Sequence, residues 1–260
     1  MPSRRKTSGR KRAGARRARP AAGAAKPLRR RSLHTVRFPG ETARYRNSRD
    51  GLLKAERELR RHVEQVAALR RRMPMGASVA KDYAFEEDGA DGTVRTVRLS
   101  ELFVPGKESL LVYSFMYGPN MQRPCPSCTC FIDGLNAMAP HVAQRTNLVV
   151  VARSPMPRIR EFARDRGWRN LRLLSSSRNS YNPDYHGEDA SGGQWPVMNV
   201  FVQRNGRVHH FYASELVFAP SDPGQDPRHL DLMWPLWNLF DLIPEGRGKD
   251  WYPALNYATP

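Results

Sequence analysis

The stretch that decides the fold runs from Ser109-Leu-Leu-Val-Tyr-Ser-Phe115, through a loop over residues 116–124, to Cys125-Pro-Ser-Cys128. Its first seven residues form a nearly continuous apolar run, which is typical of a buried strand in a parallel sheet. After the cysteines, apolar residues recur at helical spacing, at Phe131, Leu135, Met138 and Val142. The pattern predicts a strand, a loop and an amphipathic helix whose first turn carries two cysteines.

The elements that follow extend this pattern into a recognisable order. A second apolar strand is expected at residues 147–152, and a helix at residues 154–167, which has a serine cap, early prolines and a glycine stop. Asn205-Gly206 predicts a tight hairpin between strands at 197–202 and 207–212. A final apolar helix is expected at about 230–242. This is the element order of an α/β thioredoxin-like fold, in which helices flank a central mixed sheet.

The N-terminal part of the chain is predicted to be an extension of that domain. A helical stripe covers Asn47 to Arg72, and two short strands, 83–85 and 94–99, form a hairpin. We therefore expect a basic disordered tail at 1–40, a helix and hairpin extension at 41–100, and a thioredoxin-like domain at 101–260. A polar stretch at about 175–194 is expected to be a surface insertion of that domain.

The net charge of +18 is concentrated in the tail, because residues 1–31 hold 13 of the 43 Lys and Arg residues and no Asp or Glu. Such a segment buries too little apolar area to order itself. It predicts at most nonspecific contact with anions or nucleic acid through residues 1–31.

The chain is expected to be cytoplasmic and to make no membrane contact. No apolar run approaches the roughly 20 residues of a membrane span. Arg4-Arg5 is not followed by the apolar segment that an export signal needs.

The cysteine pair predicts redox chemistry. A Cys-x-x-Cys on a first helical turn places both sulfurs on one side, and the helix N-terminus stabilises a thiolate on the leading residue. Cys125 is then the nucleophile, and Cys128 resolves the mixed disulfide. Pro126 suits the first helical position because it lacks an N–H.

Two alternatives to redox chemistry stay open for the cysteines at this point. Cys125 and Cys128 could be buried structural residues, or three thiolates including Cys130 could bind a metal with His141 or His186. Residue 130 projects away from residue 125 on a helix, and no second cysteine pair exists. We therefore expect no metal and no cofactor, with Cys130 a packed thiol.

Three further residues are expected to line the site. Pro196 precedes the predicted hairpin and occupies the position where thioredoxin-like proteins carry a proline facing the dithiol. Tyr117 and Trp195 are aromatic residues beside predicted strands. The pair His209-His210 is less suited to a role in proton transfer, because its side chains should point to opposite faces of a strand.

The chain resembles the DUF899 family of bacterial thioredoxin-like proteins over about residues 41–257. The resemblance rests on Leu111-Val-Tyr-Ser-Phe-Met-Tyr-Gly-Pro119, on Cys125-Pro-Ser-Cys128 with Asp133-Gly134, and on Val149-Val-Val-Ala-Arg-Ser-Pro155. It implies the same fold and a dithiol-disulfide oxidoreductase activity. Two positions depart from the family pattern: Ser114 replaces an expected histidine, and Cys130-Phe-Ile replaces an aromatic-rich run.

The expected function is thus thiol-disulfide exchange with a protein or small-molecule thiol or disulfide, together with an unknown thiol reductant. One alternative is a peroxiredoxin-like thiol peroxidase, although Gln122 stands where a threonine would precede the reactive cysteine. Another alternative is a redox-sensing or binding module that does not catalyse a reaction.

Overall fold

The computed structural model describes residues 33–89 and 91–257. The chain divides into two compact units after Val66, inside the long helix α1 (Ala43–Arg72). Helix α1 begins before the predicted Asn47 because the Thr42 hydroxyl accepts a hydrogen bond from the Tyr45 N–H at 3.2 Å. In the first unit, Arg46 also forms ion pairs with Glu41 and Asp50. Residues 1–32 of the basic tail predicted for 1–40 lie outside the described residues.

The second unit is built on one seven-stranded mixed sheet with the order β2-β1-β5-β4-β3-β6-β7. The strands are β1 (Ala84–Asp88), β2 (Val94–Arg98), β3 (Ser109–Phe115), β4 (Asn147–Ala152), β5 (Arg172–Ser175), β6 (Met198–Arg204) and β7 (Arg207–Ala213). Strands β3, β4 and β5 are parallel, whereas β6 runs antiparallel to β3 and β7 antiparallel to β6. This is the predicted α/β thioredoxin-like fold.

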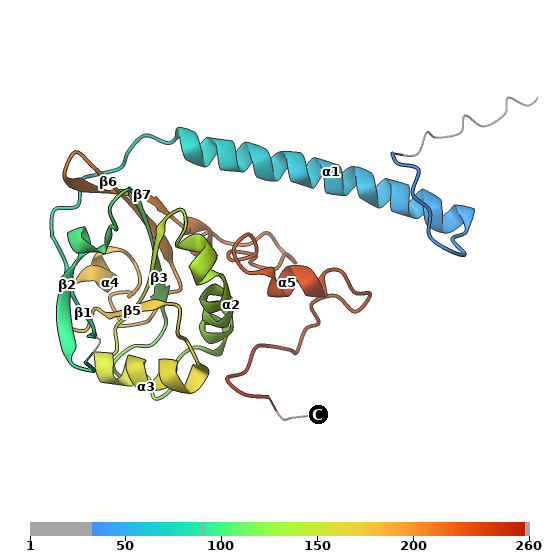
Figure 1. Cartoon of the computed structure of the whole chain (residues 1–260). Coiled ribbons are helices and arrows are strands. Elements are labelled where there is room, and N and C mark those ends of the chain that lie inside the picture. Colours follow the sequence, from blue (N-terminus) through green and yellow to red (C-terminus); the bar gives the residue numbers. More distant parts are fainter. Residues whose placement is uncertain (1–32, 90, 258–260) are drawn as a thin grey trace, which may run out of the picture. The chain divides into compact units, whose positions relative to one another are not determined.

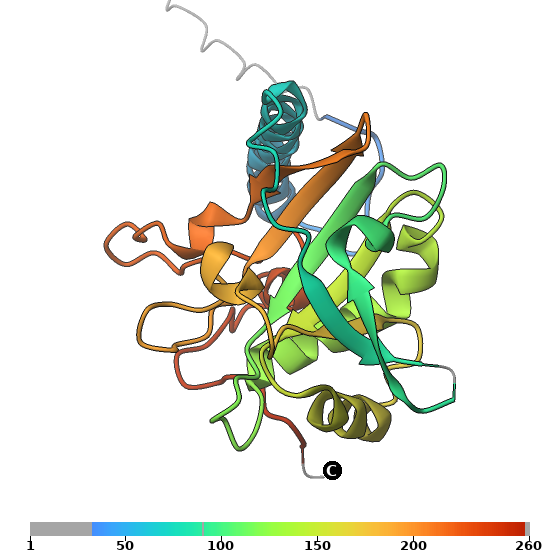
Figure 2. The same cartoon turned by 90° about the vertical axis from the view of Figure 1, so that its left-hand side faces the viewer.

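The helices of this unit are α2 (Pro126–Val142), α3 (Met156–Arg166), α4 (Tyr181–Asp184) and α5 (Pro235–Phe240), with short 3-10 turns η1 (Leu99–Leu102) and η2 (Glu215–Val217). Figure 1 shows α2 and α3 beside the central strands, and Figure 2 shows the β6–β7 and β1–β2 hairpins at opposite ends of the twisted sheet. The last helix begins at Pro235 rather than at residue 230, because a proline disfavours the helical conformation in the residue before it, and it ends at Phe240.

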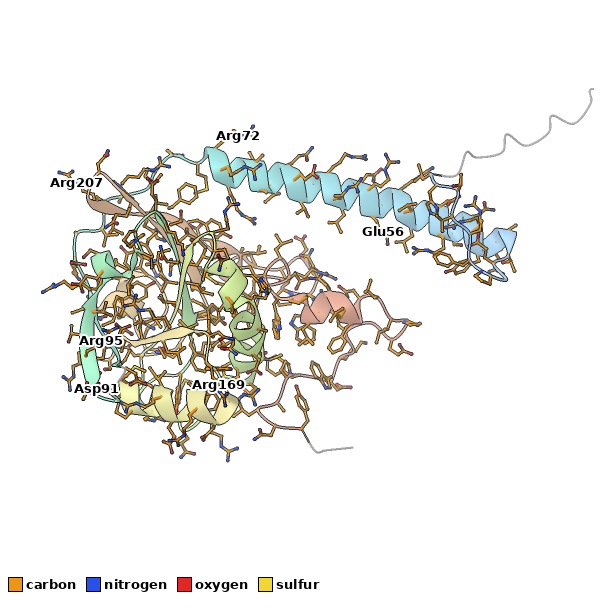
Figure 3. All side chains as sticks on the ribbon, in the orientation of Figure 1. Glu56, Arg72, Asp91, Arg95, Arg169 and Arg207 are labelled. Atoms are coloured by element: carbon orange, nitrogen blue, oxygen red, sulfur yellow. The ribbon has the colours of Figure 1, made fainter. Side chains whose placement is uncertain are left out.

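Alternating side chains of the central strands pack into two separate hydrophobic cores, one on each face of the sheet. On one face, Tyr113 and Phe115 of β3 pack with α2, α3 and residues Leu230 and Trp234. On the other face, Leu110 and Val112 pack with the β1–β2 hairpin, η1 and α4. The strand period of two thus buries both faces of β3, which explains its continuous apolar sequence. Figure 3 shows how densely side chains fill the space around the sheet.

The β1–β2 hairpin, which the sequence assigns to the N-terminal extension, pairs with β5 and so extends the same sheet. Buried Glu87 of β1 reinforces this edge through ion pairs with Arg172 of β5 at 2.7 Å and Arg95 of β2 at 2.8 Å. Figure 3 labels Arg95 and Asp91 on this hairpin.

The polar stretch at 175–194 is not confined to the surface. Tyr181 and Asn182 in it are fully buried, and the Ser176 hydroxyl donates to the Asn182 side-chain oxygen at 2.6 Å. Internal hydrogen bonds of this kind allow a polar sequence to enter the core, which composition alone does not reveal.

The hairpin between β6 and β7 follows its prediction. Asn205 and Gly206 have φ values of 51° and 72°, as a tight two-residue turn requires. Strand β6 pairs with β3, which places Pro196, just before β6, near the end of β3. The Ser114 N–H there donates to the Val197 carbonyl at 2.8 Å.

Replacement of Ile132 by alanine should destabilise the fold by about 2–5 kcal/mol, because this fully buried side chain holds α2 against the sheet and its loss leaves a cavity. Urea denaturation measures the change in the free energy of unfolding. Leu216→Ala, at a side chain that is 55% exposed, is the control and should change it by less than about 0.5 kcal/mol. Equal losses in the two variants would contradict this assignment of the core.

Candidate active site

The dithiol lies where the chain returns from the end of β3 to the start of α2. Cys125 is the residue that caps α2, with an extended backbone (φ −60°, ψ 125°), and Pro126 follows in the first turn. The Cys125 N–H donates to the Met116 carbonyl at 3.0 Å, and the Cys125 carbonyl accepts from the Thr129 N–H at 3.0 Å. These two bonds fix the nucleophile candidate between strand and helix.

All three cysteines are free thiols, but their environments differ. Cys125 is half-buried, Cys128 is only 2% exposed, and both contribute to the core that covers α2. An accessible leading sulfur and a buried second sulfur are the arrangement that an attacking and a resolving thiol require.

The pKa of Cys125 is lowered to about 6. The largest cause is a hydrogen bond from the Cys128 thiol, and the backbone N–H groups of Cys128 and Ser127 and the Tyr252 hydroxyl add to it against the opposing effect of burial. These donors are the unpaired groups of a helix N-terminus together with its neighbours. Cys125 is therefore mainly thiolate at pH 7.

The pKa of Cys128 moves the other way, well above its ordinary value, because burial and the neighbouring Cys125 disfavour a second negative charge. The fully buried Tyr113 partly offsets this, since its hydroxyl lies beside the Cys128 sulfur and lowers the pKa of that thiol. Among the residues that the structure describes, the Tyr113 hydroxyl has no hydrogen-bond partner of ordinary geometry, so its effect on Cys128 comes from proximity. The pair thus holds one negative charge, on Cys125.

A cavity of about 340 Å³ opens onto the two sulfurs. One side is formed by the dithiol turn together with Met116 and Pro196, and the other by a C-terminal segment, residues 226–252. We call this segment the C-terminal cover. The cover brings Tyr252 and three tryptophans, Trp234, Trp237 and Trp251, to the cavity.

Ion pairs hold the C-terminal cover in shape. The Arg247 guanidinium bonds Asp231 at 2.6 Å and Asp241 at 2.7 Å, and Arg228 bonds the same two carboxylates at 3.1 Å. Arg247 and Asp231 are largely buried, with side chains 10% and 11% exposed. Two guanidinium groups shared between two carboxylates form a network rather than isolated pairs, and partial burial strengthens each charge-assisted bond.

The structure brings some of the predicted site residues together and separates others. Cys125, Cys128 and Pro196 line the cavity, and Pro126 occupies the first turn of α2. Tyr117 instead packs in the core against Phe115, with the Arg158 guanidinium 4.7 Å from its ring centroid. Trp195 donates from its indole N–H to Asp189 and stacks near Phe218, away from the lining.

Sequence patterns alone do not identify the remaining residues of the site. The apolar run predicts that Tyr113 lies in a strand and nothing more. A tyrosine in a buried strand usually needs a polar partner for its hydroxyl, and this need could have identified Tyr113 as a site residue. The sequence of the C-terminal cover has only the pattern of an ordinary helix. Its three tryptophans within 18 residues, 234–251, are the feature that could have indicated a binding surface.

Cys130 does not line the cavity. It is half-buried, and burial followed by the neighbouring Asp133 raises the pKa of its thiol. Within residues 33–89 and 91–257, no group of three or more His, Cys, Asp or Glu side chains is placed to hold a metal ion. Over the same ranges, no helix has the length and apolar character to cross a bilayer.

Comparison with known proteins identifies a family. A family described as a bacterial protein of unknown function (DUF899) matches residues 35–258. None of the curated proteins compared with the chain matches it.

The solved structures it resembles are distant. The reduced 2-Cys peroxiredoxin of Plasmodium vivax has a TM-score of 0.41 at 18% identity, over 54% of this chain and 70% of its own. The mitochondrial 2-Cys peroxiredoxin of Plasmodium falciparum has a TM-score of 0.41 at 12% identity, over 65% of this chain and 95% of its own. The exposed lipoprotein thioredoxin of Streptococcus pneumoniae has a TM-score of 0.36 at 14% identity, over 58% of this chain and 97% of its own. The fold is therefore assigned from the order and direction of the strands themselves.

The rate of Cys125 alkylation by iodoacetamide should rise with pH around a midpoint near 6, because only the thiolate reacts. The measurement uses a Cys130→Ser background and mass spectrometry. Adding Cys128→Ala should move the midpoint upward, since the Cys128 thiol makes the largest contribution to the lowered pKa of Cys125. A midpoint that remains near 6 without Cys128 would contradict this account.

Proposed function

The chain belongs to the DUF899 family, and we propose that it is a dithiol-disulfide oxidoreductase in which Cys125 attacks and Cys128 resolves. The observation that carries the proposal is the asymmetry of the pair. Cys125 has a lowered pKa at a helix N-terminus and faces a cavity, whereas Cys128 is buried directly behind it with a raised pKa. A structural pair of buried thiols has no need of such a difference.

In the first step the Cys125 thiolate attacks one sulfur of a substrate disulfide. A bond forms between the Cys125 sulfur and that substrate sulfur, the substrate S–S bond breaks, and the second sulfur leaves as a thiolate that takes a proton from water. Pro196 and Met116 line the cavity together with the dithiol.

The second step releases the product. Once Cys125 is in the mixed disulfide its negative charge is gone, which removes one of the causes that raise the pKa of Cys128. Cys128 then gives its proton to water and attacks the Cys125 sulfur, which displaces the remaining substrate thiolate; that thiolate takes up a proton from water and leaves as a thiol. Two electrons pass from the dithiol to the substrate, and an external dithiol must return two electrons to reopen the Cys125–Cys128 disulfide.

The test is a single turnover of the reduced protein with bis(2-hydroxyethyl) disulfide, followed by mass spectrometry. The unchanged chain should lose two hydrogens and form the Cys125–Cys128 disulfide. Cys128→Ser should stop at a stable mixed disulfide, and Cys125→Ser should fail to react at the cavity.

Cys130→Ser is the matched control, because it makes the same substitution at a cysteine outside the cavity. It should behave like the unchanged chain. Equal reaction in all four proteins, or reaction in none, would end the oxidoreductase hypothesis.

Tyr113→Phe should slow closure of the Cys125–Cys128 disulfide by roughly three- to tenfold at fixed pH, because the hydroxyl that favours the Cys128 thiolate is removed. Stopped-flow measurement of product release from the mixed disulfide reports this step. Tyr181→Phe is the matched control, since Tyr181 is also fully buried but lies in the core on the opposite face of the sheet. Slowing of equal size in both variants would assign the effect to general destabilisation.

A further inference from the structure

The wall that faces Cys125 across the cavity is unusually aromatic. Three of the five tryptophans of the chain, Trp234, Trp237 and Trp251, lie on it, and Tyr252 completes it beside Cys125. The proposed exchange reaction needs none of the three indole rings, because the thiols and the helix N-terminus supply its chemistry. Trp234 belongs to the core, but Trp237 and Trp251 are only partly buried and can contact a ligand in the cavity.

The rings form a continuous edge-to-face series rather than isolated contacts. The centroids of Trp234 and Trp237 are 5.7 Å apart and those of Trp237 and Trp251 are 5.8 Å apart, and both pairs are close to perpendicular. Phe240 extends the series with an edge contact to Trp251. Trp234 is only 5% exposed and is anchored on Phe131 of α2, whereas Trp251 is still 42% exposed. The wall is therefore rigid at its base and accessible at its rim.

Charge around the cavity is nearly balanced. Arg228 and Arg247 are engaged with Asp231 and Asp241, as described above. Apart from the Cys125 thiolate itself, the charged lining residues that remain are Asp226 and Lys249, of opposite sign. Burial lowers the pKa of His229, which favours its neutral form. Charge thus gives little selectivity, and the apolar rings dominate recognition.

The size of the cavity limits what can enter. About 340 Å³ is at the lower end of the range for small-molecule sites, and it accommodates a ring with a short linker rather than a folded surface.

From the tryptophan wall, the balanced charge and the volume, we infer that the substrate is a low-molecular-weight disulfide whose organic group is aromatic. Its ring packs against Trp237 and Trp251 while its sulfur meets Cys125. This inference rests on the proposed function, and it follows the same two-step exchange, in which two substrate thiols leave and the Cys125–Cys128 disulfide forms.

The experiment compares dibenzyl disulfide with diethyl disulfide in single turnovers of the reduced protein. In both compounds the sulfur is attached to an sp³ carbon, and each rate is divided by the rate of the same compound with dithiothreitol, which removes differences in intrinsic reactivity. The normalised preference for the benzyl compound should be roughly tenfold, the value of one good ring contact.

Trp251→Leu should reduce that preference severalfold, and Trp251→Phe, which keeps a ring, should restore part of it. Phe218→Leu is the matched control: Phe218 is 44% exposed, close to the 42% of Trp251, but does not line the cavity. It should leave the preference unchanged.

The outcomes separate the two proposals. Reaction with both disulfides at equal normalised rates would overturn the aromatic substrate while leaving the oxidoreductase standing. A preference lost equally in Trp251→Leu and Phe218→Leu would also overturn it. Failure to react with either disulfide, while bis(2-hydroxyethyl) disulfide still reacts, would overturn the substrate inference alone. Failure with all three compounds would overturn the proposed function as well.

Discussion

The hydrogen bond from the Cys125 N–H to the Met116 carbonyl closes the turn on which the site depends. It returns the chain to the end of β3 after a loop of eight intervening residues, 117–124, so that the first turn of α2 opens at the carboxyl edge of the parallel strands. Cys125 caps the helix in an extended conformation, and the N–H groups of Ser127 and Cys128 in the first turn lower the pKa of its thiol. Strand position, helix start and thiolate stability are thus consequences of one local geometry.

The same turn explains why two chemically identical side chains behave differently. Cys128 is one helical turn further in and packs under the sheet with Tyr113 and Phe131, where burial opposes ionisation. Cys125 remains at the cavity and receives the hydrogen bond that Cys128 can give only while it is protonated. Each thiol therefore supports the opposite state of the other, and the coupling distinguishes the two roles.

What sequence can predict depends on how local the signal is. The apolar run of β3, the Asn205-Gly206 turn and the proline after Cys125 each specify their conformation within a few residues, and the strands and the dithiol turn lie where expected. The C-terminal cover depends on contacts between residues more than 100 positions apart, such as Trp234 with Phe131, and no periodicity encodes them. Tyr117 and Trp195 lie outside the cavity lining for a related reason, since an aromatic residue beside a strand can face either the core or a site.

The separation of the dithiol turn from the C-terminal cover also bears on how such a protein can change over time. The groups that lower the pKa of Cys125 lie mainly in residues 125–128, with Tyr252 of the cover as one further donor. The tryptophans that we propose select a substrate belong to a segment beginning a hundred residues later. Substitutions at Trp237 or Trp251 alter what fits the cavity without altering the donors that stabilise Cys125. Under the proposed function, substitutions in the cover would change which molecules reach Cys125, while the ion pairs of Arg228 and Arg247 would keep the segment in shape.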